Sequence, residues 1–293
     1  MIETYLKYIA HEKRYSEHTI ISYKNDLLQY QAFLSQFGFK NPLLDAKHKI
    51  IRAWIVSLVE DKISAKSVNR KIATLRSFYK FLLMRELIEI NPTIQLKSLK
   101  TKKPLPEFVQ EREIINLLDN TIFPDDFSGW RDKLILELFY GTGIRLSELI
   151  NIKNESVDFY HNSIKVLGKR NKERIIPLTL NLVNIIRTYY AKKEEAFSGS
   201  IENNLLLTDA GNKCYPMMVQ RIVKKYLGNN TKSSKKSPHV LRHTYATHLL
   251  NKGADLNAVK DLLGHSSLAA TQVYTHNSLE KLKSVFDKAH PKA

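Results

Sequence analysis

Apolar residues recur every three or four positions through the first 95 residues, the spacing that predicts amphipathic helices. Helices are expected at 2–9, 16–34, 50–59 and 67–84. The last of these carries an apolar stripe made by Val68, Ile72, Leu75, Phe78, Tyr79 and Leu82. Its opposite face is polar and carries Asn69, Arg70, Lys71, Arg76 and Lys80. Residues 1–95 are therefore predicted to form a helical bundle.

The pattern changes after residue 106 but stays mostly helical. Helices are expected near 110–119, 128–140, 145–152, 180–196, 215–227, 238–252, 255–263 and 267–274. Two β-branched apolar runs within 163–178 flank a polar turn, which predicts a β-hairpin with Lys169 near its tip. Residues 278–288 predict a tail helix with one apolar face, made by Leu279, Leu282, Val285 and Phe286. The second domain, 107–293, is thus mainly α with a small sheet.

The stretch between the domains contains Pro and several Lys and lacks acidic residues. It predicts a basic linker at 96–106, either crossing a phosphate backbone or acting as a disordered spacer. Its candidate DNA contacts are Lys100, Lys102 and Lys103.

Charge narrows the class of partner. The chain has 293 residues with 46 Lys and Arg against 29 Asp and Glu, a formal net charge of +17, which favours a polyanion. On the polar face of the 67–84 helix, DNA contact and ordinary solvation remain alternatives. The candidate contacts there are Lys66, Arg70, Lys71 and Arg76.

Composition also excludes several classes of protein. The single Cys214 allows no internal disulfide and no Cys-based zinc site, which favours a reducing compartment. No apolar run approaches the length of a membrane span, and the N-terminus lacks a signal-peptide core. A cytoplasmic protein without a membrane partner is expected.

One face of the predicted helix at 238–252 concentrates candidate chemistry. His239, Arg242 and His243 share that face because residues three and four apart are neighbours on a helix. An Arg fork fits a phosphate, and imidazoles can donate to its other oxygens. The two His also have metal-ligand spacing, but a cation between them and the absence of an intervening acid favour phosphate. No metal and no cofactor are expected.

A second Arg follows the Gly141-Thr-Gly143 turn. Arg145 precedes Glu148 by three residues, and Glu148 either supports it or interacts with the helix dipole. The turn lacks the Lys of a P-loop. A phosphate site of this kind needs a nucleophile, and Tyr274 is available; a phenol with a reference pKa near 10 needs help in losing its proton.

The chain resembles the tyrosine site-specific recombinases in the order of its candidate residues: Arg145, Lys169, His239-x-x-Arg242, His265 and Tyr274. Its length and lack of extra domains resemble the Xer-type subgroup. The resemblance implies an N-terminal SAM-like bundle and a C-terminal catalytic domain. It makes Tyr274 the nucleophile, Lys169 the acid for the leaving 5′-oxygen, and Glu148 and His243 supporting residues. Lys172 and Arg174 are further candidate phosphate contacts. Gly168-Lys169-Arg170 departs from the family's usual Gly-Lys-Gly.

The resemblance further implies cutting and rejoining of double-stranded DNA through a 3′-phosphotyrosyl intermediate and a Holliday junction. The assembly would be a homo- or hetero-tetramer, with a second recombinase, on two DNA sites. Chromosome-dimer resolution at cell division, with a septal DNA translocase, is the expected task. The alternatives are a mobile-element integrase or invertase, a type IB topoisomerase-like enzyme, and a DNA-binding protein without chemistry. In related recombinases the tail helix docks on a neighbouring subunit; folding back on its own domain is the other option.

Overall fold

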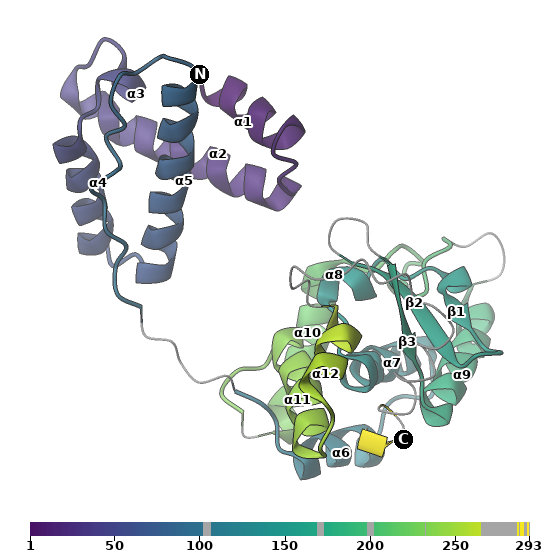
Figure 1. Ribbon diagram of the computed structural model, residues 1–293. Coiled ribbons are helices and arrows are strands. Elements are labelled where there is room, and N and C mark those ends of the chain that lie inside the picture. Colours follow the sequence, from purple (N-terminus) through teal and green to yellow (C-terminus); the bar gives the residue numbers. More distant parts are fainter. Residues whose placement is uncertain are drawn as a thin grey trace. The chain divides into compact units, whose positions relative to one another are not determined.

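The chain forms two compact units, Met1–Pro104 and Leu105–Ala293 (Figure 1). The computed structural model describes residues 1–101, 107–168, 173–197, 202–231, 233–264, 286, 288, 289 and 292. The described residues are mainly helical, with one small antiparallel sheet, so the predicted fold class is confirmed.

The N-terminal unit is a helical bundle around an aromatic-rich core. Its core residues include Tyr5, Leu27, Trp54 and Phe78, each at most 3% exposed. Ser16 and Ser64 accept hydrogen bonds from the backbone of the first turns of the helices that follow, which fixes where those helices begin. The elements are α1 (Ile2–His11), α2 (Glu17–Leu34), a 3₁₀ turn (Ser35–Phe37), α3 (Pro42–Asp45), α4 (His48–Glu60) and α5 (Ala65–Met84).

The polar face of α5 is less exposed than its sequence predicts. Lys71 is only 5% exposed, and its ammonium donates to Asp26 at 2.9 Å. Asp26, itself 1% exposed, also accepts from Arg70 and from the Thr74 hydroxyl. The expectation that Lys71 faces solvent is therefore wrong, because a buried carboxylate on α2 requires a cationic partner.

The segment that follows α5 packs on the same unit. The side-chain amide of Asn69 donates to the Leu99 carbonyl at 2.9 Å and accepts from the Leu99 amide at 2.7 Å. Arg76 donates to the carbonyl of Leu96, whose side chain is 5% exposed. Residues 96–101 therefore lie along α5 and do not form a free spacer. Lys102 and Lys103 lie outside the described residues.

In the C-terminal unit, α7 lies between α9 and α11 (Figure 1). The sheet has the order β1-β2-β3 and is antiparallel throughout; Val166 of β2 lies opposite Arg174 of β3. The hairpin is as predicted, whereas β1 was missed because it is only two residues long. The elements are α6 (Glu111–Asn120), α7 (Phe127–Thr142), α8 (Leu146–Leu149), a 3₁₀ turn (Asn154–Ser156), β1 (Val157–Asp158), β2 (Ser163–Leu167), β3 (Glu173–Pro177), α9 (Leu180–Ala196), α10 (Pro216–Asn230), α11 (Pro238–Asn251) and α12 (Leu256–Leu263).

The end of the chain packs within its own unit. Phe286 is 1% exposed and joins a cluster with Tyr245 of α11 and Leu262 of α12. The Lys292 ammonium lies 2.8 Å from both Asp119 and the buried Glu137. For these residues the structure shows the tail against its own unit. Residues 278–285 lie outside the described part of the chain.

Candidate active site

The turn between α7 and α8 places Arg145. Gly143 ends α7 with φ +60°, and a Cβ built on it would lie 2.4 Å from the Tyr245 ring and 2.8 Å from Leu263. A glycine is needed here both for the left-handed backbone and for the close approach of α11 and α12. Two residues later, Arg145 occupies the N-cap of α8 with its side chain still 30% exposed.

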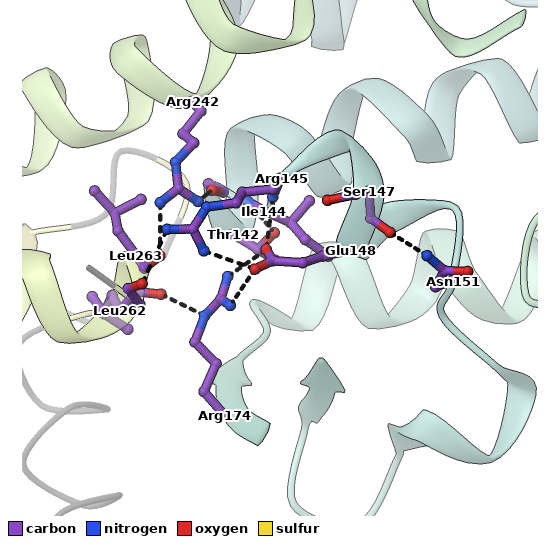
Figure 2. Close-up of polar contacts among 12 residues, drawn as sticks. Thr142, Ile144, Arg145, Ser147, Glu148, Asn151, Arg174, Arg242, Leu262 and Leu263 are labelled. Atoms are coloured by element: carbon purple, nitrogen blue, oxygen red, sulfur yellow. Dashed lines mark hydrogen bonds and ion pairs between the residues drawn. The ribbon is translucent and has the colours of Figure 1, made fainter. Parts of the chain in front are cut away.

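Glu148 holds Arg145 at two points. Its carboxylate accepts from the Arg145 backbone amide at 2.8 Å and from Arg145 Nη1 at 2.8 Å (Figure 2). Burial by itself raises the pKa of Glu148, but the hydrogen bonds and charge of Arg174, together with Arg145, lower it to about 2. Glu148 is thus a permanent anion at neutral pH and a fixed anchor for Arg145.

Arg242 reaches the same place from α11. Its Nη2 donates to the Leu263 carbonyl at 2.7 Å, and its Nη1 donates to the Gly143 carbonyl. Burial and the positive charge of Arg145 lower the pKa of Arg242 to about 10, so it remains cationic at neutral pH. Arg145 Nη2 donates to the Gly264 carbonyl at 3.0 Å, and the two guanidinium groups lie side by side at the end of α12 (Figure 2).

Arg174 is not the exposed phosphate contact that its sequence position suggests. It is 5% exposed, and its two Nη atoms each donate to a Glu148 oxygen at 2.8 Å. Its Nε donates to the Leu262 carbonyl at 3.1 Å. The prediction failed because alternation along β3 turns position 174 towards the unit's interior, where Glu148 receives the charge.

These four side chains carry an excess of positive charge. Arg145, Arg174 and Arg242 contribute three cations, and Glu148 contributes one anion. The neighbouring guanidinium groups repel one another, so an anionic ligand beside Arg145 and Arg242 would be stabilised. Planar guanidinium forks match the oxygens of a phosphate, which makes phosphate the chemistry that this cluster fits best.

His239 and His243 are exposed on α11, on the helix face that also carries Arg242. The structure therefore brings Arg145, Glu148 and Arg242 together at this turn, and the two His lie on the same helix as Arg242. Lys169, Lys172, His265 and Tyr274 lie outside the described residues; Gly168 and Gly264 are the last described residues before the segments that contain them.

The basic candidates of the N-terminal unit divide into two kinds. Lys66 and Lys100 are exposed, as are Arg70 and Arg76, which also bond to groups of their own unit. Lys71 is committed to Asp26 and leaves the set of candidate DNA contacts. Asp26 itself was missed, because nothing in the local sequence distinguishes a buried acid from a solvated one.

Backbone acceptors are the other part of the site that sequence reasoning missed. The carbonyl groups of Gly143, Leu262, Leu263 and Gly264 together position all three guanidinium groups. Side-chain chemistry gives no signal for such acceptors. The Leu-Leu-Gly end of α12, whose Gly264 has φ +62°, was the available clue, because the last carbonyls of a helix lack intrahelical donors.

Comparison with known proteins places this site in a family. The model of the phage integrase family matches residues 107–281, and that of the phage integrase N-terminal SAM-like domain matches residues 2–86. The chain belongs to the phage integrase family. Tyrosine recombinase XerC of Chlorobaculum parvum is 37% identical, over 100% of this chain and 94% of its own length. Tyrosine recombinase XerD of Staphylococcus haemolyticus is also 37% identical, over 100% of this chain and 99% of its own.

A solved structure shares the fold. The XerH site-specific recombinase bound to a palindromic difH substrate matches with a TM-score of 0.72 and 19% identity, over 90% of this chain and 78% of that one. As a member of this family with tyrosine recombinases as relatives, the chain is an enzyme of the DNA breaking-and-rejoining class. The predicted family is confirmed.

Two kinds of feature are absent from the described residues. No group of three or more His, Cys, Asp or Glu side chains there is arranged to hold a metal ion. Among the same residues, no helix is long and apolar enough to cross a membrane.

Proposed function

We propose that the chain is a site-specific recombinase that acts on double-stranded DNA through Tyr274. The phenol oxygen attacks a backbone phosphorus, the new bond is a 3′-phosphotyrosyl ester, and the bond from phosphorus to the 5′-oxygen breaks. The freed 5′-hydroxyl then attacks the phosphotyrosine of a partner strand, which restores the phosphodiester. Since one ester replaces another, the sequence of steps needs no cofactor.

The observation that carries this proposal is the pairing of Arg145 and Arg242 over the Glu148 anchor. Both guanidinium groups are fixed by protein acceptors, and Arg145 stays partly exposed. Preorganised cations of this kind stabilise charge that develops on the non-bridging oxygens of a phosphorane. Within the proposal, His239 donates a hydrogen bond to the same phosphate, with support from His243 and His265, and Lys169 protonates the leaving 5′-oxygen.

We further propose a tetramer on two DNA sites, with exchange through a Holliday junction. The equal identity to a XerC and a XerD supports a Xer-type role without separating the two. We therefore propose chromosome-dimer resolution at cell division, with a second recombinase and a septal DNA translocase as partners. The charge of +17 supports DNA as the substrate. Exposed Lys66, Arg70, Arg76 and Lys100 are the proposed backbone contacts of the N-terminal unit.

Mapping of covalent protein–DNA adducts in cells tests the task. One adduct site per chromosome is the expected result. Adducts at the ends of mobile elements would make the chain an integrase or invertase. Dispersed adducts, with relaxation of supercoiled DNA by the monomer, would make it a topoisomerase-like enzyme.

Kinetics of the two arginine variants test the mechanism. Arg145→Ala or Arg242→Ala should lower single-turnover cleavage at saturating DNA by on the order of 10²-fold or more, because each loses contacts that strengthen in the transition state. DNA affinity should change little by comparison. Arg187→Ala, which removes an exposed Arg of α9, is the matched control. A loss confined to affinity would contradict the assigned roles.

A further inference from the structure

Arg174 lies where three parts of the catalytic unit meet. It is on β3, which ends the hairpin loop that contains Lys169. Its two Nη atoms hold both oxygens of Glu148 on α8, and its Nε holds the carbonyl of Leu262 on α12 (Figure 2). All three nitrogen atoms thus donate to groups of the protein, and the side chain is 5% exposed. A phosphate of bound DNA is not what this guanidinium faces.

Arg174 also acts on Arg145 and Arg242, through the groups that it holds in place. Glu148 is the carboxylate that fixes Arg145, at both its backbone amide and its Nη1. The α12 end that Arg174 holds also supplies the acceptors for Arg242, at Leu263, and for Arg145, at Gly264. Displacing Arg174 would therefore loosen an acceptor of each.

Gly264 shows how closely the end of α12 is fitted to Arg174. It has φ +62°, and a Cβ placed on it would lie 3.2 Å from Arg174 Cδ and Nη1. The guanidinium thus packs against bare backbone at the last described residue before His265. The contact fixes α12 relative to β3 at the point where the chain continues towards His265.

We propose that Arg174 is a positioning residue for strand cleavage: it locks Glu148 and the end of α12 so that Arg145 and Arg242 face the phosphate in a fixed geometry. The inference rests on the proposed function, since it assigns Arg174 a role in the same site. Arg174 acts through its neighbours and does not touch the DNA. A displacement of about 1 Å in such a site costs on the order of 10²-fold in rate.

The ionisation of Glu148 gives a readout that a purely structural role would not move. Among the residues that the structure describes, the charged groups that face Glu148 are Arg145 at the start of its own helix, Arg174 from β3, and Arg242 from α11. Arg174→Met removes the strongest of these contacts, and burial then raises the pKa of Glu148. Below that raised pKa, Glu148 becomes protonated and Arg145 loses its anchor.

The test compares Arg174→Met with the wild-type full chain in single-turnover cleavage of a nicked suicide duplex between pH 5 and 8. The ratio of the two rates at each pH is the readout, because any group that titrates equally in both proteins cancels in it. We expect a loss on the order of 10²-fold at saturating DNA, little change in affinity, and a ratio that falls further as the pH falls. Adding Glu148→Gln to Arg174→Met should make the ratio independent of pH. Arg187→Met, an exposed site on α9, is the control and should match the wild type.

A ratio that does not change with pH in Arg174→Met, or a loss that appears only as weaker DNA binding, overturns the inference. Should Arg174→Met fail to fold, Arg174→Lys keeps the charge but loses the fork, and a smaller fall of the ratio at low pH is expected. The ¹³C shift of the Glu148 carboxyl, followed against pH without DNA, reports its pKa directly. An unshifted pKa in either variant refutes the role of Arg174, whereas absence of adducts in the wild type refutes the proposed function.

Discussion

At the scale of single residues, Gly143 is constrained twice. Its φ of +60° disfavours any residue with a Cβ, and the space where that Cβ would lie is filled by Tyr245 and Leu263. Its carbonyl also accepts from Arg242. The same glycine therefore ends α7, admits α11 and α12, and orients a proposed catalytic side chain.

Gly253 offers a matched comparison, because it has φ +84° and an added Cβ would meet open space. Gly253→Ala should cost only the backbone strain, about 1–2 kcal/mol. Gly143→Ala should cost at least ~1 kcal/mol more, because overpacking adds to the strain, and should also lower cleavage. Urea unfolding measures the loss of stability, and cleavage of a nicked suicide duplex measures the loss of activity. Equal destabilisation by the two variants would contradict the packing argument.

At the scale of elements, periodicity predicted most of the described helices, because most of them bury an apolar face; α3 was not predicted, and α8 covers only Leu146–Leu149 of the helix expected at 145–152. The helix expected at 267–274 lies outside the described residues. The stripe of α5 is fully buried as expected, and the hairpin of β2 and β3 lies where its β-branched runs placed it. What periodicity missed depends on partners distant in sequence. Lys71 is buried because Asp26 lies 45 positions earlier on α2, and Arg174 is buried because Glu148 lies on α8. No local pattern encodes such pairs.

The side chains of the site were more predictable from the sequence than its backbone acceptors. Arg145, Arg242 and the two His could be selected from spacing and chemistry, and the structure brings their elements together. The Leu-Leu-Gly end of α12 marked where unpaired helix carbonyls lie, but not which guanidinium groups they face, because only the fold decides that.

The Lys71 contact yields a prediction for α5. Lys71→Ala should lower the stability of the N-terminal unit by about 3 kcal/mol, the lower end of the usual cost of breaking a buried ion pair, because Arg70 and Thr74 still pair with Asp26. Lys80→Ala, on the exposed face of the same helix, should change stability by less than ~0.5 kcal/mol. Trp54, whose ring lies 5.8 Å from the Lys71 ammonium, reports unfolding in a Trp130→Phe background. Similar effects of both variants would place Lys71 at the surface after all.

At the scale of the whole molecule, the structure ties the chain's end to its own C-terminal unit. Phe286 fills a cluster with Tyr245 and Leu262, beside the helices that carry Arg242 and the acceptors of the site. Tail packing and active-site geometry therefore share the same elements, α11 and α12.

Phe286→Ala should consequently lower the stability of the C-terminal unit by about 3–5 kcal/mol, the usual cost of emptying a buried aromatic site. Leu256→Ala, at an exposed position of α12, is the control and should cost far less. Hydrogen exchange of α11 and α12 amides would locate the loss in this cluster. Unchanged exchange there in Phe286→Ala would show that the tail does not support these helices.

The central claim is that Tyr274 attacks DNA at the arginine cluster. Tyr274→Phe removes one oxygen and retains the ring, so the variant should bind a mapped recombination site as the wild type does. On a nicked suicide duplex it should form no covalent complex, while Tyr160→Phe, altered at an 89% exposed tyrosine, should form as much as the wild type. Denaturing gel electrophoresis of the labelled duplex measures the adduct. Adduct formed by Tyr274→Phe at the wild-type rate would contradict the account, because another residue would then be the nucleophile.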